Sequence, residues 1–171
     1  MKLAVAAVTA YHEPQRIMNN DNLDLYFMNE ALKEAKKAVL KDEVPVGCVI
    51  VYNKKIIARG HNNRQKENSV FGHAEIIAIK KANKRLKTWL LENCDIYITL
   101  EPCLMCAGAI MQSRMRRLIF ATFEPKFGVA GSIINVFNNP AFNHQVEVTS
   151  GILQLETSQL MKDFFKDLRS R

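Results

Sequence analysis

Two short stretches place the strongest constraint on this chain: His73-Ala74-Glu75 and Pro102-Cys103-Leu104-Met105-Cys106. One histidine and two cysteines three positions apart offer soft or borderline ligands, which suit a tetrahedral zinc ion whose fourth position stays open to water. The histidine precedes the cysteines by about thirty residues, so the fold must bring the two stretches together. Glu75 need not bind the ion, because a carboxylate beside the open position is suited to moving protons there.

The chain is 171 residues long, the size of one domain with a hydrophobic core. No apolar run approaches the roughly 18 residues that a membrane-spanning helix needs, so we expect no membrane segment. Residues 1–20 lack a clear hydrophobic period and carry Pro14, and we expect a poorly ordered N-terminal extension there. Lys2 followed by a short apolar run leaves a signal peptide as the alternative.

The four cysteines are an even number, but their pattern favours metal binding over disulfides. Cys103 and Cys106 form a C-x-x-C motif in a chain that is neither short nor clearly secreted. Metal ligation fits a reducing compartment, so we expect a cytoplasmic protein. Cys48 and Cys94 stand alone in apolar stretches and are expected to be small buried side chains.

The formal net charge is +7 and the sequence pI is near 9.3. A basic balance fits a nucleic-acid partner, and it equally fits lysine faces that are simply solvated. Lys80, Lys81, Lys84, Arg85 and Lys87 gather toward the end of a predicted helix, where cations are also favourable for structural reasons. The charge by itself leaves both interpretations open.

Hydrophobic periodicity divides the chain into helices and strands. The valine- and isoleucine-rich segment 46–52, for example, is typical of a strand, and Asn53-Lys54 is typical of a turn into a second strand. The strand–helix–strand–helix–strand order predicts a three-layer α/β fold with parallel strands after the first hairpin. We predict helices over 21–41, 73–86, 102–113 and 153–169, and strands over 46–52, 55–60, 95–100 and 116–121. Residues 146–148 are expected to form a short strand or an extended link, and residues 61–71 and 124–143 are expected to be loops.

The helix boundaries bear directly on the metal ligands. His73 and Glu75 are two positions apart and would not share one face of a regular helix, so we expect His73 at the very start of its helix. A helix that begins at Pro102 would hold Cys103 and Cys106 in its first turn, where the helix dipole favours thiolate. A redox C-x-x-C would not need His73, and a structural zinc site normally has four protein ligands.

This ligand set predicts a hydrolytic reaction. An open zinc site lowers the pKa of bound water to about 7 and makes hydroxide available. Hydroxide can attack a ring carbon that carries an amino group. Glu75 would take the proton from water, pass it to the ring nitrogen and help ammonia leave.

Longer stretches resemble a known family. The zinc signature alone resembles the wider cytidine-deaminase-like superfamily. The narrower resemblance is to the bacterial tRNA-specific adenosine deaminases, over nearly all of residues 21–171, which we take as one zinc-dependent deaminase domain. It lies in Glu43-Val44-Pro45-Val46-Gly47, in Gly72-His73-Ala74-Glu75, and in the unbroken stretch from Thr99 through Glu101-Pro102-Cys103 to Ala109.

The resemblance implies a fold, a reaction and partners. It implies a three-layer α/β/α, cytidine-deaminase-like fold with a mixed sheet of about five strands. It also implies a homodimer with one Zn²⁺ per subunit that converts adenosine to inosine at the wobble position of a tRNA anticodon stem-loop. By resemblance His73, Cys103 and Cys106 bind zinc, and Glu75 is the proton shuttle.

The resemblance also marks residues that face the substrate base. Asn62 matches an asparagine that contacts the base in the pocket, and an amide can pair with the edge of adenine. A turn-forming role beside Asn63 is the alternative. Val46 lines the pocket, close to Cys48, which stands where similar sequences often have alanine.

Contacts to the RNA are expected from the second half of the chain. Glu124 stands where the family often has aspartate in the RNA-contacting loop, and Lys126 offers a cation beside it. Phe165 offers a partly exposed ring on which a base can stack. Phe164 falls on the apolar face of its predicted helix and is expected in the core.

Two other functions stay open on these residues. The same catalytic core serves deaminases of free bases or nucleosides such as guanine or cytosine. A non-catalytic zinc-binding subunit would keep the fold without the reaction, although a structural site has no use for the carboxylate of Glu75.

Overall fold

The computed structural model describes residues 20–171. The expected N-terminal extension therefore lies outside the described residues, apart from residue 20, which begins the first helix. In chain order the elements are α1 (Asn20–Val39), β1 (Gly47–Tyr52), β2 (Lys55–His61), α2 (Arg64–Glu67), α3 (Ala74–Leu86), β3 (Cys94–Leu100), α4 (Leu104–Gln112), β4 (Arg117–Thr122), the 3-10 turn η1 (Val136–Asn138), β5 (Glu147–Ser150) and α5 (Gln154–Ser170).

The described strands form one mixed sheet in the order β2-β1-β3-β4-β5. β1 pairs antiparallel with both β2 and β3, whereas β3, β4 and β5 are parallel to one another. The prediction of parallel strands after the hairpin is thus confirmed. In α/β sheets ligands bind beyond the carboxyl ends of the parallel strands, and here that edge is where β3 and β4 end at Leu100 and Thr122.

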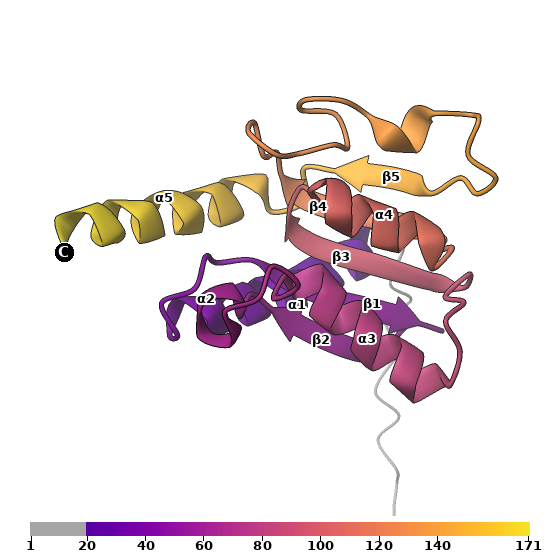
Figure 1. Cartoon of the computed structure of the whole chain (residues 1–171), viewed down its shortest axis with the longest axis horizontal. Helices are drawn as coiled ribbons and strands as arrows, with labels where there is room; N and C mark the ends of the chain where they lie inside the picture. Colours follow the sequence, from indigo (N-terminus) through magenta and orange to yellow (C-terminus); the bar gives the residue numbers. More distant parts are fainter. Residues whose placement is uncertain (1–19) are drawn as a thin grey trace, which may run out of the picture.

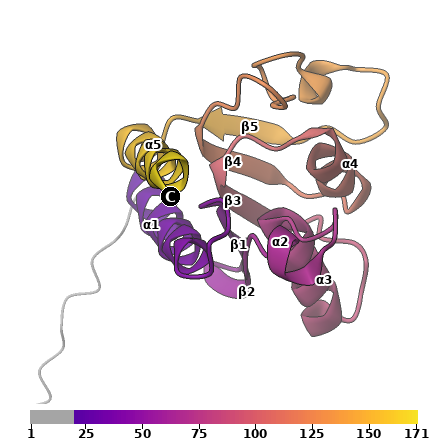
Figure 2. The same ribbon diagram turned by 60° about the vertical axis from the view of Figure 1, so that its left-hand side comes forward.

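Helices cover both faces of the sheet (Figures 1 and 2). Side chains along β3 alternate accordingly: Ile96 and Ile98 pack in the core beneath α3 and α4, whereas Tyr97 packs toward α1. α5 runs outward on the same side as α1. The predicted three-layer α/β/α fold with a mixed five-stranded sheet is confirmed. None of the described helices is long and apolar enough to cross a membrane.

The hairpin between β1 and β2 turns without a glycine. Asn53 and Lys54 both adopt left-handed backbone angles, with φ of 48° and 58°. Positive φ at both central residues is the signature of a type I′ turn, whose twist matches that of the flanking strands. The predicted two-residue turn is correct. Asn53 suits the first of the two positions, because asparagine tolerates the left-handed conformation.

Two differences from the predicted elements lie near the metal-binding motif and the loop before it. α4 begins at Leu104 because Cys103 is extended and forms an antiparallel bridge with Gly128. The predicted loop 61–71 contains the short helix α2, which has no buried residue and therefore no apolar period to reveal it.

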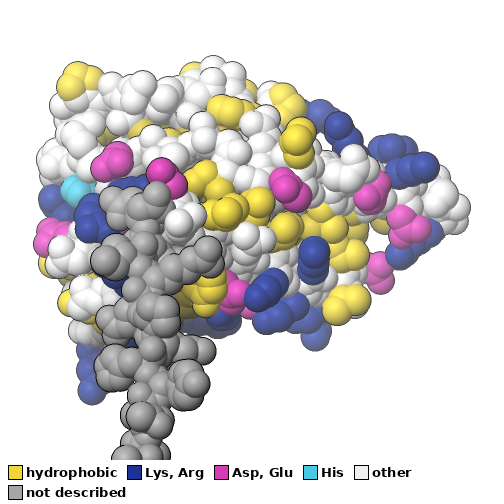
Figure 3. Space-filling view, turned by 180° about the vertical axis from the view of Figure 1, so that it is seen from behind, with side chains coloured by type: hydrophobic (Ala, Val, Ile, Leu, Met, Phe, Trp, Pro, Cys, Tyr) yellow, Lys and Arg dark blue, Asp and Glu magenta, His cyan; other side chains and the backbone are white. Residues whose placement is uncertain are grey.

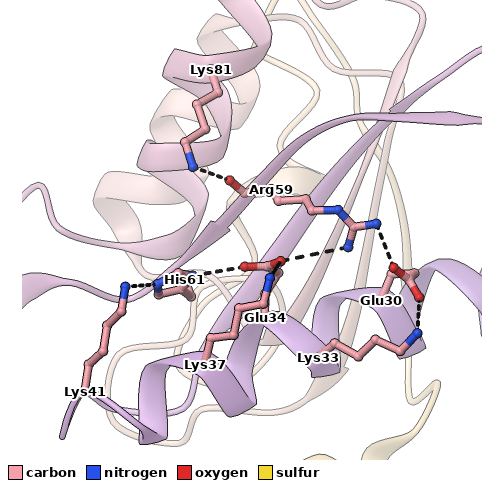
Figure 4. A network of polar contacts seen from close by, with 8 residues as sticks. All are labelled: Glu30, Lys33, Glu34, Lys37, Lys41, Arg59, His61 and Lys81. Atoms are coloured by element: carbon pink, nitrogen blue, oxygen red, sulfur yellow. Dashed lines mark hydrogen bonds and ion pairs between the residues drawn. The ribbon is translucent and has the colours of Figure 1, made fainter.

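α1 is held against the sheet by close backbone packing and by an ion-pair network. Glu30 binds Arg59 of β2 at 2.7 Å, and Glu34 contacts His61 at 3.0 Å. Lys81 of α3 reaches the Arg59 carbonyl at 2.8 Å, so the network joins three elements (Figure 4). It fixes the end of β2 from which the chain enters the site.

The close approach of α1 to β1 predicts a steric effect at Gly47. A Cβ added there would lie 2.0 Å from the Ala31 carbonyl oxygen and 2.3 Å from the Ala35 nitrogen. We expect Gly47→Ala to lower the free energy of unfolding by about 1–3 kcal/mol, measured by denaturant unfolding. Gly108→Ala is the control, because nothing lies within 4 Å of its added Cβ. An unchanged stability of Gly47→Ala would contradict the packing described.

Candidate active site and metal centre

The metal ligands lie where two helices begin. His73 is the residue before α3 and is extended, with φ −82° and ψ 143°. Cys103 is the residue before α4 and is also extended, with φ −76° and ψ 172°. The prediction that His73 lies at the very start of its helix is confirmed. Cys103 lies just outside α4 instead of inside its first turn, and Cys106 lies in that turn.

The three ligand atoms face one another. His73 Nδ1 lies 3.7 Å from Cys103 Sγ and 3.4 Å from Cys106 Sγ. All ligand atoms of the cluster fall within 4.8 Å of one another, and no other such group occurs in the part of the chain that the structure describes. Around a tetrahedral zinc ion, nitrogen and sulfur ligands stand about 3.5 Å apart. The residues therefore fit a metal with three protein ligands.

The two thiols have different proton affinities. Cys106 donates a hydrogen bond to Cys103, which lowers the pKa of the Cys103 thiol to about 4. The same hydrogen bond, together with burial, raises the pKa of Cys106. Contact with Cys103 also raises the pKa of His73. The lowered pKa favours the thiolate form of Cys103, which is the form that binds metal.

Glu75 lies in the first turn of α3, one residue beyond Ala74, and its side chain is almost fully buried. Burial raises the pKa of this carboxyl, because removal from water disfavours the charged form. A carboxyl whose pKa is shifted toward neutrality can both accept and donate a proton.

A cavity of about 960 Å³ lies over this cluster. His73, Cys103 and Glu75 line it, whereas the fully buried Cys106 does not. The remaining sequence-predicted site residues all line the same cavity: Val46, Asn62, Glu124, Lys126 and Phe165. Segments far apart in the sequence thus meet around one space.

Asn62 is oriented by the start of α3. Its Oδ1 accepts a hydrogen bond from the Ala74 backbone N–H at 3.1 Å, and the side chain is buried. With the oxygen engaged, the amide can offer its NH₂ group to a substrate. The side chain is therefore suited to donate a hydrogen bond to an acceptor on the ring. The sequence suggested that the whole amide pairs with the edge of adenine, but its oxygen is already used by the Ala74 N–H.

α5 supplies one wall of the cavity, through residues that include Met161, Lys162, Phe164 and Phe165. Phe165 is partly exposed, as predicted. Phe164 lines the cavity and meets Phe165 edge-on at 5.4 Å, so its expected place in the core is wrong. Phe164 faces the cavity because this part of α5 lies beyond the sheet and has no strand to pack against (Figure 1).

Two buried carboxylates at the cavity were not singled out from the sequence. Glu43 accepts from the Lys66 backbone N–H at 2.8 Å and so holds α2. Glu101 accepts from the backbone of the loop that follows β4. The available signal was the position of each acidic residue, with Glu43 directly before Val-Pro and Glu101 directly before Pro-Cys.

Comparisons with known proteins agree with this geometry. The chain matches the model of the MafB19-like deaminases over residues 21–169. The tRNA-specific adenosine deaminase of Bacillus subtilis is 48% identical over 148 residues, which cover 86% of this chain and 92% of that protein. The tRNA-specific adenosine deaminase of Rickettsia typhi is 48% identical over 145 residues, covering 84% and 98%.

Solved structures separate two kinds of deaminase. A structure from work on A-to-I editing by tRNA:A34 deaminases has a TM-score of 0.76 and 41% identity, and covers 79% of this chain and 98% of that one. A guanine deaminase from Bacillus subtilis has a TM-score of 0.58 and 30% identity, and covers 90% and 96%. The similarity is greater to the structure described for tRNA editing.

The ligand geometry predicts the effect of removing one sulfur. We expect Cys103→Ser to bind far less zinc than the wild type, measured by mass spectrometry of metals after dialysis, because a hydroxyl is a poor substitute for a thiolate. Cys94→Ala is the control, since Cys94 is buried in β3 and belongs to no metal cluster. Wild-type metal content in Cys103→Ser would refute the ligand assignment.

Proposed function

This chain belongs to the family of tRNA-specific adenosine deaminases, and on that premise we propose that it hydrolyses adenosine to inosine at the wobble position of a tRNA anticodon. Residues 21–171 are the deaminase domain of this proposal. The observation that carries it is the cluster of His73, Cys103 and Cys106, of which His73 and Cys103 line one cavity together with Glu75.

The resident metal of the proposal is one Zn²⁺ per subunit, held by His73, Cys103 and Cys106. Imidazole and thiolates are ligands that zinc prefers, and their spacing fits tetrahedral coordination. When bound, the ion supplies the Lewis acidity that makes water a nucleophile near neutral pH.

Glu75 moves the protons of the reaction. Its carboxylate takes one proton from the attacking water as the water oxygen bonds to C6 of the adenine ring, and delivers that proton to the ring nitrogen N1. Glu75 then moves the proton of the new C6 hydroxyl to the amino group, the C6–N bond breaks as the C6 carbonyl forms, and ammonia leaves. The balance is one water consumed and one ammonia released, with the carboxylate regenerated.

Asn62 and Val46 hold the base for this step. The NH₂ group of Asn62 donates to an acceptor on the purine, and the apolar Val46 side chain packs against the ring. An anticodon loop presents bases that are already poorly stacked, so extruding one into the cavity is easier than extruding it from a duplex.

The outer walls receive the rest of the stem-loop. Glu124 and Lys126 face the cavity from the loop after β4, and the Glu124 carboxylate accepts from the Lys126 backbone N–H at 2.9 Å. Phe165 offers a ring for stacking. α5, which projects at the right of Figure 3, also carries lysines and arginines among acidic side chains. The basic balance of the chain thus serves attraction to phosphates.

The proposal includes a homodimer in the cytoplasm, where tRNA is modified. Support for a second copy comes from large apolar side chains exposed in the described residues, among them Phe71 at 63% and Leu104 at 63%. Surfaces of this kind are commonly covered by another protein.

The two alternatives are weaker. A free-base deaminase would share the metal cluster, but the guanine deaminase from Bacillus subtilis is only 30% identical. A non-catalytic zinc subunit would not need a buried Glu75 with a raised pKa at the cavity. Release of ammonia from guanine, with no inosine formed in RNA, would favour the free-base reaction.

The role of Glu75 predicts a loss of chemistry without a loss of metal. We expect Glu75→Gln to lower inosine formation in a wobble-adenosine stem-loop by at least about 100-fold, because general acid–base catalysis contributes about that much. Zinc content should stay at the wild-type level. Glu92→Gln, at an exposed position, is the matched control. Wild-type turnover by Glu75→Gln would rule out the proton shuttle.

Contact of Lys126 with phosphate predicts a change in salt dependence. The affinity of the wild type for the stem-loop should fall steeply with salt, because phosphate contacts release counterions. Lys126→Gln should make the slope of log affinity against log salt shallower by about one. Lys55→Gln, at the exposed start of β2, should keep the wild-type slope. Equal slopes in all three proteins would contradict a phosphate contact at Lys126.

A further inference from the structure

Both oxygens of one buried carboxylate are engaged by a single loop. Glu101 lies between the end of β3 and the cysteine ligands, and its side chain is only 2% exposed. Its Oε2 accepts from the Glu124 backbone N–H at 2.9 Å. Its Oε1 accepts from the backbone N–H groups of Ala130 and Ser132, at 2.8 and 3.0 Å. The Ser132 hydroxyl also donates to Oε2.

The same loop, residues 124–132, is pressed against the metal-binding motif. The Val129 backbone N–H donates to the Pro102 carbonyl at 3.1 Å, and Gly128 pairs with Cys103 in an antiparallel bridge. A Cβ added at Gly128 would lie 2.2 Å from Glu101 Oε2. Only glycine lets the loop approach the carboxylate this closely.

The first part of this loop faces the cavity through Glu124, Lys126 and Phe127. Hydrogen bonds to a charged acceptor are stronger than neutral ones, and a buried donor that loses its acceptor is strongly destabilised. Glu101 therefore connects the segment that bears the cysteine ligands to the wall that faces the substrate.

We propose that Glu101 is a positioning residue, which fixes loop 124–132 against the metal-binding motif and so sets where Glu124 and Lys126 meet the RNA. The identity of the substrate in this inference rests on the proposed function, whereas the anchoring itself does not. Glu101 acts through the loop and does not touch the reacting atoms.

Glu101→Gln tests the proposal with little change in size. An amide has one acceptor oxygen, and when that oxygen serves Ala130 and Ser132, its NH₂ group faces the Glu124 N–H. We expect KM for the stem-loop to rise about tenfold, the fold-change that corresponds to loss of one charge-assisted hydrogen bond. We expect kcat to stay within about threefold, and zinc content to equal that of the wild type, because the reacting centre is intact.

Glu43→Gln is the matched carboxylate-to-amide control. Glu43 is as buried as Glu101 and also lies at the cavity, but its hydrogen bond to the Lys66 N–H uses Oε1 alone. One amide oxygen can keep that bond. The rise in KM should therefore be several-fold smaller than for Glu101→Gln.

A second pair of variants tests the contact between Glu101 and the loop by changing the loop side of it. Gly128→Ala should raise KM as Glu101→Gln does, whereas Gly108→Ala, with open space around its added Cβ, should leave KM unchanged. The double variant Glu101→Gln/Gly128→Ala should be no worse than the more affected single variant, because both disturb one contact.

Hydrogen exchange at the amides of loop 124–132 measures the anchoring of the loop without any substrate. In Glu101→Gln the Glu124 amide should exchange faster than in the wild type. An unchanged KM would overturn the proposal, and so would a fall in kcat accompanied by loss of zinc, which would place Glu101 in the metal site. If the wild type forms no inosine, the proposed function fails, and unchanged exchange at Glu124 would then overturn the anchor.

Discussion

The site depends on two helix starts that meet at one edge of the sheet. α3 can begin there because small residues let it approach β2 closely: a Cβ added at Gly60 would lie 2.2 Å from the Ala74 carbonyl oxygen. α4 begins beside it because β3 delivers the chain to Cys103. The extended backbone at His73 and Cys103 aims both side chains at one point, and the helices behind them favour negative charge on the sulfurs.

The walls and the floor of the cavity are stabilised by different kinds of interaction. The floor is a packed junction of helices and strands, in which Glu75 and Cys106 are buried. The walls are loops and one projecting helix. Thr122 fixes the start of α5 through its hydroxyl, which contacts Thr157 at 2.5 Å, and Arg171 ties the far end to Asp42 at 2.6 Å. This division suits a reaction that needs fixed chemistry and a surface for a large substrate.

Much of the fold and of the metal site could be predicted from the sequence. The metal cluster was predictable because zinc restricts both the type and the spacing of its ligands. The layers were predictable because strands and helices alternate along the chain. The short helix α2 was not, because four polar residues carry no period. The role of Glu101 was not predictable, because its partners lie over twenty residues away and three of them are backbone N–H groups. Phe164 was misplaced because an apolar helix face indicates burial without indicating what covers it.

We infer that this cavity deaminates one adenosine of an intact tRNA. The most direct test is to incubate the zinc-loaded protein with a full-length tRNA that has adenosine at the wobble position, and to map inosine along the whole RNA by sequencing. We expect inosine at the wobble position, no inosine at adenosines of the paired stems, and none from free adenosine at the same concentration. Inosine scattered through the RNA, or formed as readily from free adenosine, would contradict a site whose outer walls select the anticodon loop.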